Sequence, residues 1–183
     1  PVELMPTVGR HLADLAAAAL EGALAIARTE VAEGLGGGLC SAPARGASVD
    51  ALDLAIIGMG KCGARELNYI SDVDVVYVIA PVPASELPDE GVGPLTEQDC
   101  AQIGTELVHA LTKAIMAPAS EPPLWEVDAN LRPEGKDGPL VRTVESYVSY
   151  YKRWAENWEF QALLKARPVA GSAHLGRRFA HAI

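Results

Sequence analysis

The spacing of apolar residues predicts helices at both ends and in the middle of the chain. Residues 10–33 carry small and apolar side chains every three or four positions, as on the buried face of an amphipathic helix. A second such pattern follows Thr96, a helix-capping residue type, and we expect Pro118 to end it. A third covers residues 143–166 and predicts one long helix, ended by the proline at Pro168.

Continuous or alternating apolar runs predict three strands. Residues 52–59 form a short apolar run that ends in glycine, which is typical of a buried strand. Residues 73–79 are rich in β-branched side chains. Residues 124–131 alternate between an apolar and a polar face, and the polar face carries acids. We expect residues 64–69 to form a short helix between the first two strands.

Segments rich in glycine, proline and small polar residues separate these elements. Residues 34–46 predict a mobile linker, and residues 133–139 predict a turn-rich loop. Residues 81–94 contain four prolines and several acids, and this loop is long enough to act as a flap.

Two aspartates one residue apart are the first candidate site. Asp72 and Asp74 stand at the start of the second predicted strand, so both side chains point to the same side. Their charges repel, and a fold tolerates this most easily when a cation lies between them or water covers them. Asp128, on the polar face of the third strand, adds a third carboxylate. Three such acids on neighbouring strands can hold two magnesium ions, whereas solvated acids at a strand edge are the simpler alternative.

A glycine-rich loop lies just before the acids. Gly58, Gly60 and Gly63 match the G-x-G-x-x-G pattern of dinucleotide-binding folds. Only nine residues separate Gly63 from the next strand, which is short for a crossover helix, and the acids come too early for a ribose contact. A loop that holds phosphates with its backbone and Lys61 is a second interpretation. A glycine turn that binds nothing is the third.

The remaining polar and aromatic candidates each have two interpretations. Glu126 is either an accessory acid or an exposed strand residue, and Arg132 reaches either a phosphate or a surface acid. An aromatic stripe at helical spacing is either a packed helix face or a surface for a partner or an adenine ring. Its members are Tyr147, Tyr150, Tyr151, Trp154 and Trp158. We expect Lys165 and Arg167 to be solvated near a helix C-terminus.

Composition and charge narrow the classes of function. The net charge of −9 argues against non-specific binding to nucleic acid. The three cysteines are odd in number and form no C-x-x-C pair, which favours reduced thiols and a cytoplasmic protein. No run of ~18 apolar residues predicts a membrane span. The chain starts at Pro1 and ends just after an expected helix, so we expect a piece of a larger protein.

Three ordered blocks resemble one enzyme family. Residues 58–74 read Gly-x-Gly-Lys-x-Gly, then Glu-Leu-Asn-Tyr-x-Ser-Asp-x-Asp. Residues 127–133 read Val-Asp-Ala-Asn-Leu-Arg-Pro, and residues 138–141 read Gly-Pro-Leu-Val. A third block follows at residues 158–167. Together they resemble the bifunctional glutamine synthetase adenylyltransferase/adenylyl-removing enzymes, over residues 54–171.

The resemblance implies a fold and its division. The family is built like the palm of DNA polymerase β, so we expect an α+β nucleotidyltransferase fold with a mixed sheet, flanking helices and helical additions at both ends. Residues 1–50 would form the helical lead-in and linker, residues 51–140 the nucleotidyltransferase core, and residues 141–183 a helical extension. Gly60-Lys61 stands where the superfamily usually has Gly-Gly or Gly-Ser, as is normal for this family.

The resemblance also implies ligands and partners. Magnesium would be held by three acids, and the nucleotide and inorganic phosphate by four further residues. The acids are Asp72, Asp74 and Asp128; the phosphate-binding set is Gly60, Lys61, Ser71 and Arg132. Glutamine synthetase would be the protein substrate, with ATP or ADP as nucleotide and a nitrogen-signalling protein as a regulatory partner. No partner nucleic acid or membrane is expected.

The direction of the implied reaction rests on small differences. Residues 138–141 and the Tyr150-Tyr151 pair look more like the adenylyl-removing half, which releases AMP from a tyrosine by phosphorolysis. The ATP-dependent adenylylating half remains an alternative. A nucleotide-binding regulatory module without chemistry, or an NAD-dependent oxidoreductase domain, are the alternatives from other classes.

Overall fold

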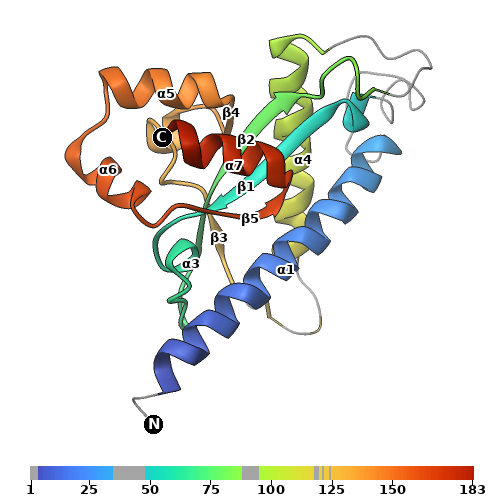
Figure 1. Cartoon of the computed structure of the whole chain (residues 1–183). Helices are drawn as coiled ribbons and strands as arrows, with labels where there is room; N and C mark the ends of the chain where they lie inside the picture. The colour runs from blue at the N-terminus through green and yellow to red at the C-terminus, as the bar shows by residue number, and fades with distance from the viewer. Residues whose placement is uncertain (1–3, 35–47, 88–94, 118–119, 121, 124) are drawn as a thin grey trace.

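The chain folds into one mixed sheet with helices on both of its faces (Figure 1). The computed structural model describes residues 4–34, 48–87, 95–117, 120, 122–123 and 125–183. The helices are α1 (Met5–Ala32), α3 (Gly60–Ala64), α4 (Glu97–Met116), α5 (Val144–Arg153), α6 (Asn157–Leu163) and α7 (Ala173–Ala182), with a 3₁₀ turn η2 (Gly135–Asp137). The strands are β1 (Leu52–Gly58), β2 (Val73–Pro81), β3 (Val127–Asp128), β4 (Val141–Arg142) and β5 (Arg167–Gly171).

The sheet is mixed, and its order places β2 and β1 at the centre. The strands follow the order β3-β2-β1-β5, and β4 also pairs with β2. β1 runs antiparallel to β2 and to β5, whereas β3 and β4 run parallel to β2. A dinucleotide-binding βαβ unit needs its two strands parallel, so the antiparallel β1–β2 pair excludes that interpretation of the glycine loop.

Alternation along β2 divides the core into two layers. Val73, Val75 and Tyr77 pack with α1 and α4 on one face of the sheet. Val76 and Val78 pack on the other face, with side chains from α5 and α7. Because the period of a strand is two residues, Asp74 shares its face of the sheet with Val76 and Val78.

The long elements confirm the sequence patterns. The first predicted helix is α1, which starts five residues earlier than expected, and its buried face repeats small residues such as Ala16, Ala23 and Ala27. α4 begins after Thr96, whose hydroxyl accepts a hydrogen bond from the Asp99 backbone while the Asp99 carboxylate accepts one from the Thr96 backbone. No helix in the described part of the chain is both long and apolar enough to cross a membrane.

Three predictions of local structure were wrong. Residues 64–69 are not a helix, because α3 ends at Ala64 and Arg65 then adopts a left-handed conformation with φ 61°. The predicted strand at 124–131 is only two residues long, since the chain turns after Asp128. The long helix predicted at 143–166 is two helices, α5 and α6, separated by three residues at 154–156.

The predicted linker lies almost wholly outside the described residues, and so does half of the predicted flap. Of residues 34–46, only Gly34 is described. Pro81, which was assigned to the flap, is the last residue of β2, and residues 88–94 lie outside the described part. Pro118, the expected stop of α4, and Leu124 lie outside it as well. The loop at 133–139 contains the 3₁₀ turn η2, as its turn-rich sequence indicated.

Candidate functional site

The register between two parallel strands brings the predicted acids together. Asp74 on β2 is the direct partner of Asp128 on β3, and Asp72 precedes Asp74 by two residues. Burial raises the pKa of Asp74 above its ordinary value of 3.8, and the carboxylates of Asp128 and Asp72 raise it further. The three acids therefore lie within electrostatic reach of one another, and among the described residues Lys61 is the cation that offsets their like charges at Asp74, without balancing them.

The glycine loop packs directly against Asp74. The Met59 backbone N–H donates to the Asp74 carbonyl at 2.8 Å, which fixes the loop to the start of β2. Gly60 has φ +49°, and a Cβ atom there would lie 2.8 Å from Asp74 Oδ2. Any side chain at residue 60 would thus be strained and would displace the carboxylate. The glycine is required by the acid next to it.

Lys61 and Ser71 meet on the same side of the site. The Lys61 ammonium lies 3.4 Å from Ser71 Oγ, and Ser71 Oγ donates to Asn68 Oδ1 at 2.6 Å. The positive charge of Lys61 also lowers the pKa of Asp74, although less than the other causes raise it. Lys61 is exposed at the surface, so its ammonium group is accessible to an anionic ligand.

The carboxylates of Asp72, Asp74 and Asp128 are suitable ligands for magnesium, but in this structure their oxygens do not meet around one point. Among the described residues, no three histidine, cysteine, aspartate or glutamate side chains stand close enough together to hold an ion. One oxygen of Asp128 accepts a hydrogen bond from the Asn130 backbone N–H at 2.6 Å. Carboxylate oxygens from three acids are the ligands that magnesium prefers. Shared binding therefore requires side-chain rotation, which the exposed position of Asp72 allows.

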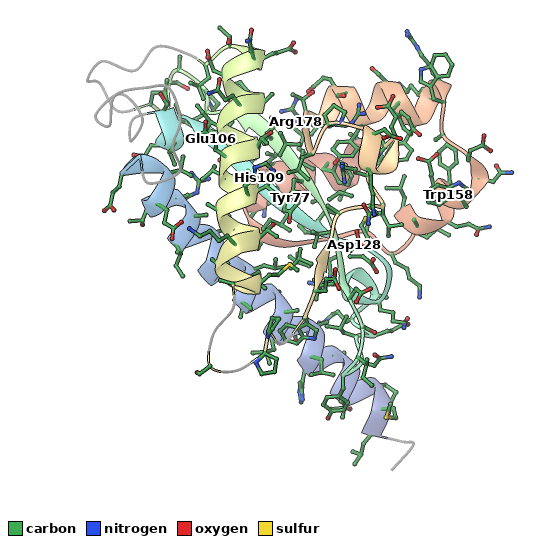
Figure 2. The ribbon with its side chains drawn as sticks, turned by 180° about the vertical axis from the view of Figure 1, so that it is seen from behind. Tyr77, Glu106, His109, Asp128, Trp158 and Arg178 are labelled. Atoms are coloured by element: carbon green, nitrogen blue, oxygen red, sulfur yellow. The ribbon has the colours of Figure 1, made fainter. Side chains whose placement is uncertain are left out.

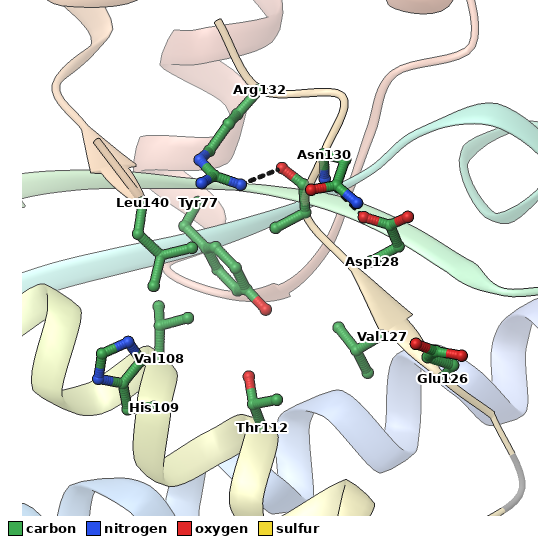
Figure 3. A pocket seen from close by; sticks show the side chains of 11 residues that line it. Tyr77, Val108, His109, Thr112, Glu126, Val127, Asp128, Asn130, Arg132 and Leu140 are labelled. Carbon is green, nitrogen blue, oxygen red and sulfur yellow. Dashed lines mark hydrogen bonds between the residues drawn. The ribbon is translucent and has the colours of Figure 1, made fainter. Parts of the chain in front are cut away.

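Arg132 has a structural role that neither prediction anticipated. Its guanidinium donates to the Ala129 carbonyl at 2.9 Å, as Figure 3 shows, and to the carbonyls of Gly138 at 3.2 Å and Lys136 at 3.3 Å. These bonds close the loop between β3 and β4. Within the described part of the chain these bonds use three of the five N–H donors of the side chain, so binding of a phosphate by Arg132 would fall to the other two.

A pocket of about 500 Å³ lies beside β3 (Figure 3). Its walls come from α4, from β3 with the residues around it, and from Leu140 just before β4. The Tyr77 and Thr112 side chains point toward each other at its floor. Burial raises the pKa of Tyr77 to about 12, so its hydroxyl is neutral there. Glu126 lines the rim and is exposed, as its simpler interpretation predicted.

Arg167 and Asn68 support the site and were not recognised as doing so. Arg167 Nε donates to the Gly63 carbonyl at 3.0 Å and its terminal nitrogen to the Cys62 carbonyl at 3.3 Å. The Arg167 side chain therefore caps the C-terminal end of α3. The prediction had placed it at the C-terminus of the helix expected at residues 143–166. Asn68 accepts from the Ile70 backbone, an Asx turn for which the Asn at this spacing is the sequence signal. Lys165 pairs with Glu66 at 2.9 Å.

The aromatic stripe is buried in one part and exposed in another. Tyr147 and Tyr151 are buried and stack with ring centroids 6.3 Å apart, and Tyr147 also meets Phe179 edge-on at 5.1 Å. These residues form a packed helix face, as the simpler interpretation predicted. Trp154 and Trp158 are 72% and 55% exposed, and Figure 2 shows Trp158 on the outer side of the molecule, away from α4.

A mixed sheet with helices on both faces, and an acid pair at the start of its second strand, is compatible with a nucleotidyltransferase fold. The family model for glutamate-ammonia ligase adenylyltransferase matches residues 2–182. The chain therefore belongs to this family, as its three sequence blocks predicted.

Named relatives agree with the family. A bifunctional glutamine synthetase adenylyltransferase/adenylyl-removing enzyme of Bifidobacterium longum (strain NCC 2705) is 51% identical over 180 residues, which are 98% of this chain and 15% of the relative. The enzyme of the same description from Leifsonia xyli is 51% identical over 183 residues, 100% of this chain and 17% of the relative. That from Nocardia farcinica is 45% identical over 183 residues. The chain thus spans about a sixth of these relatives' length.

Proposed function

We propose that this chain is a nucleotidyltransferase domain that removes AMP from a tyrosine of glutamine synthetase by phosphorolysis. The single observation that supports it best is the pairing of Asp74 with Asp128 next to Asp72 and the glycine loop, within a chain of this family. The pairing supplies an acidic centre, and the loop supplies a cation and donors for phosphate oxygens beside it.

The three acids have one task in this proposal. Asp72, Asp74 and Asp128 hold magnesium, which when bound neutralises negative charge that develops on the phosphoryl oxygens. The raised pKa of Asp74 fits this role, because a group of like charges with too few cations gains most from a divalent ion. Lys61 and Ser71 hold phosphate oxygens at the same side, and Gly60 allows that ligand to approach the backbone.

The reaction needs little covalent participation by the protein. An oxygen of inorganic phosphate attacks the phosphorus of the AMP group, and a new P–O bond forms as the bond to the tyrosine oxygen breaks. The products are ADP and a tyrosine whose oxygen takes up a proton. Positioning and charge neutralisation therefore carry the catalysis, which is the usual pattern for phosphoryl and nucleotidyl transfer. In this proposal the three acids and Lys61 position the reacting groups and neutralise their charge.

The removing direction is supported by resemblance in two places. Residues 138–141 and the Tyr150-Tyr151 pair are similar to the removing half of the family's enzymes. In the structure Tyr151 is part of the core, and the ring centroid of Tyr150 lies 5.8 Å from the central carbon of the Arg142 guanidinium. Both contacts help to fix α5, the helix that follows the acidic centre in the chain. A nitrogen-signalling partner and a cytoplasmic location remain predictions.

A parallel incubation tests the proposal. The chain is mixed with adenylylated or with unmodified glutamine synthetase, each with magnesium and either phosphate or ATP, and ADP release and AMP incorporation are measured. The proposal expects ADP only from the adenylylated protein with phosphate. Incorporation from ATP into the unmodified protein would assign the adding direction instead. Magnesium-dependent nucleotide binding without turnover in any mixture would point to a regulatory module. The Asp72→Asn variant is the inactive control.

A further inference from the structure

A turn beside the acidic centre carries two large apolar side chains in solvent. Tyr69 is 71% exposed and Ile70 is 97% exposed. Ile70 is the most exposed large apolar side chain in the described residues. Single exposed apolar residues are common, but an adjacent pair directly before Ser71 and Asp72 in the chain needs a reason.

The exposure of this pair is built into the turn. Asn68 Oδ1 accepts from the Ile70 backbone N–H at 3.2 Å and from Ser71 Oγ at 2.6 Å. The Ser71 backbone N–H also bonds the Asn68 carbonyl at 3.3 Å. These three bonds close a tight turn on its own side chain, so the tip is held outward by geometry.

The base of the turn is fixed to two other elements. Leu67 is buried, and the backbone at residues 66–67 lies so close to α1 that a Cβ at Gly9 would be 3.2 Å from the Leu67 carbonyl. Arg65 pairs with Asp14 on α1, and Lys165, just before β5, pairs with Glu66 at 2.9 Å. The base of the turn is therefore anchored to α1 and to the segment just before β5.

The position of the tip links it to the chemistry. Ile70 is followed directly by Ser71, which contacts Lys61, and then by Asp72. Charged and polar groups at this site suit a nucleotide phosphate, whereas rigid aromatic and aliphatic side chains suit the buried centre of a protein–protein contact. A reacting tyrosine carried by a protein must bring its own surroundings against the surface next to the acids.

We propose that Tyr69 and Ile70 contact the protein that carries the modified tyrosine and set specificity for that protein substrate. The inference rests on the proposed function, and it adds the surface through which the substrate is recognised. Apolar residues that flank the modified tyrosine would cover the two side chains. The contact would then lower KM for the protein substrate and leave the nucleotidyl transfer itself unchanged.

A double variant tests this with two substrates. Tyr69→Ser with Ile70→Ser should raise KM for adenylylated glutamine synthetase at least tenfold and leave kcat within about threefold. Phosphorolysis of a small ester, AMP joined to free tyrosine, should be unchanged. Ile26→Ser is the matched control, because Ile26 is 52% exposed on α1 and lies many turns from the loop. Its KM should equal that of the wild type.

Each other result counts against the inference. An unchanged KM for the protein substrate in the double variant overturns it while the proposed function stands. An equal loss with the small ester also overturns it, because the two residues would then act on the nucleotide or on the fold. A wild-type chain that turns over neither substrate in either direction refutes the proposed function itself, and the inference with it.

Discussion

The contact between Gly60 and Asp74 gives the sharpest test of how the loop and the acids depend on each other. Gly60→Ala places a Cβ atom 2.8 Å from Asp74 Oδ2 at a residue with φ +49°. The left-handed backbone alone costs about 1–2 kcal/mol for a residue with a side chain. The carboxylate can rotate away, so the contact adds little to the loss of stability but moves a proposed metal ligand.

The expected magnitudes follow from these two effects. Ordinary contact begins at 3.4 Å, so the carboxylate must move by about 0.6 Å. A displacement of this size is enough to disturb a magnesium site, and we expect magnesium-dependent ADP binding to weaken about tenfold or more. The free energy of unfolding should fall by about 1–2 kcal/mol. Urea titration followed by the fluorescence of the three tryptophans, and calorimetry with ADP and magnesium, measure the two changes.

Gly22→Ala is the matched control for this substitution. Gly22 lies inside α1, and apart from the backbone of its own helix turn no atom of the described residues is within 4 Å of the position that its Cβ would take. Alanine at a helix interior gains about 0.8–1.0 kcal/mol over glycine, so this variant should be more stable and bind ADP as the wild type does. If Gly60→Ala kept both its stability and its magnesium-dependent binding, the proposed dependence of Asp74 on the glycine would be refuted.

Three further substitutions or conditions have definite expected results. Because burial and then the charges of Asp128 and Asp72 raise the pKa of Asp74, the metal-free chain should lose stability as pH rises from 3.8 through that raised pKa, and Asp74→Asn should flatten this slope in urea titrations. Gly63→Ala should fail to fold by circular dichroism, because its Cβ would lie 1.9 Å from the Lys165 carbonyl. Tyr147→Phe should lose about 1 kcal/mol in thermal unfolding, because it removes the bond from the hydroxyl to the Tyr77 carbonyl at 3.1 Å, and should leave turnover unchanged.

The local parts of the fold were predictable because their signals are short-range. The β-branched run of β2 and the cap of α4 at Thr96 are read from adjacent residues, and both were confirmed. The family was predictable for the same reason, since its motifs are contiguous blocks. Contiguous patterns need no knowledge of what packs against them.

The parts that failed depend on tertiary contacts. β5 contains Pro168, which counts against a strand, but β5 lies at the edge of the sheet, where a missing N–H is tolerated. The break between α5 and α6 occurs at residues 154–156, which include no glycine or proline, and Glu159 restarts the chain by accepting from the Glu156 backbone at 2.7 Å. None of residues 154–156 is of a type that predicts the end of a helix.

The candidate site shows the same division. The acid pair and the glycine loop were read from one segment, and the structure places them in contact. The pairing of Asp74 with Asp128 is a register between strands 54 residues apart in number, and only the fold fixes it. The caps provided by Arg167 were missed because its acceptors, the carbonyls of Cys62 and Gly63, lie far away in the sequence.

Magnesium-dependent ADP binding by the Asp128→Asn variant, measured by calorimetry, tests the central claim most directly. Glu126→Gln is the control, because Glu126 precedes Asp128 by two residues and is exposed. If acids from separate strands jointly hold the ion, affinity should fall at least tenfold for Asp128→Asn and stay at the wild-type level for Glu126→Gln. Equal affinity in the wild type and Asp128→Asn would contradict the account.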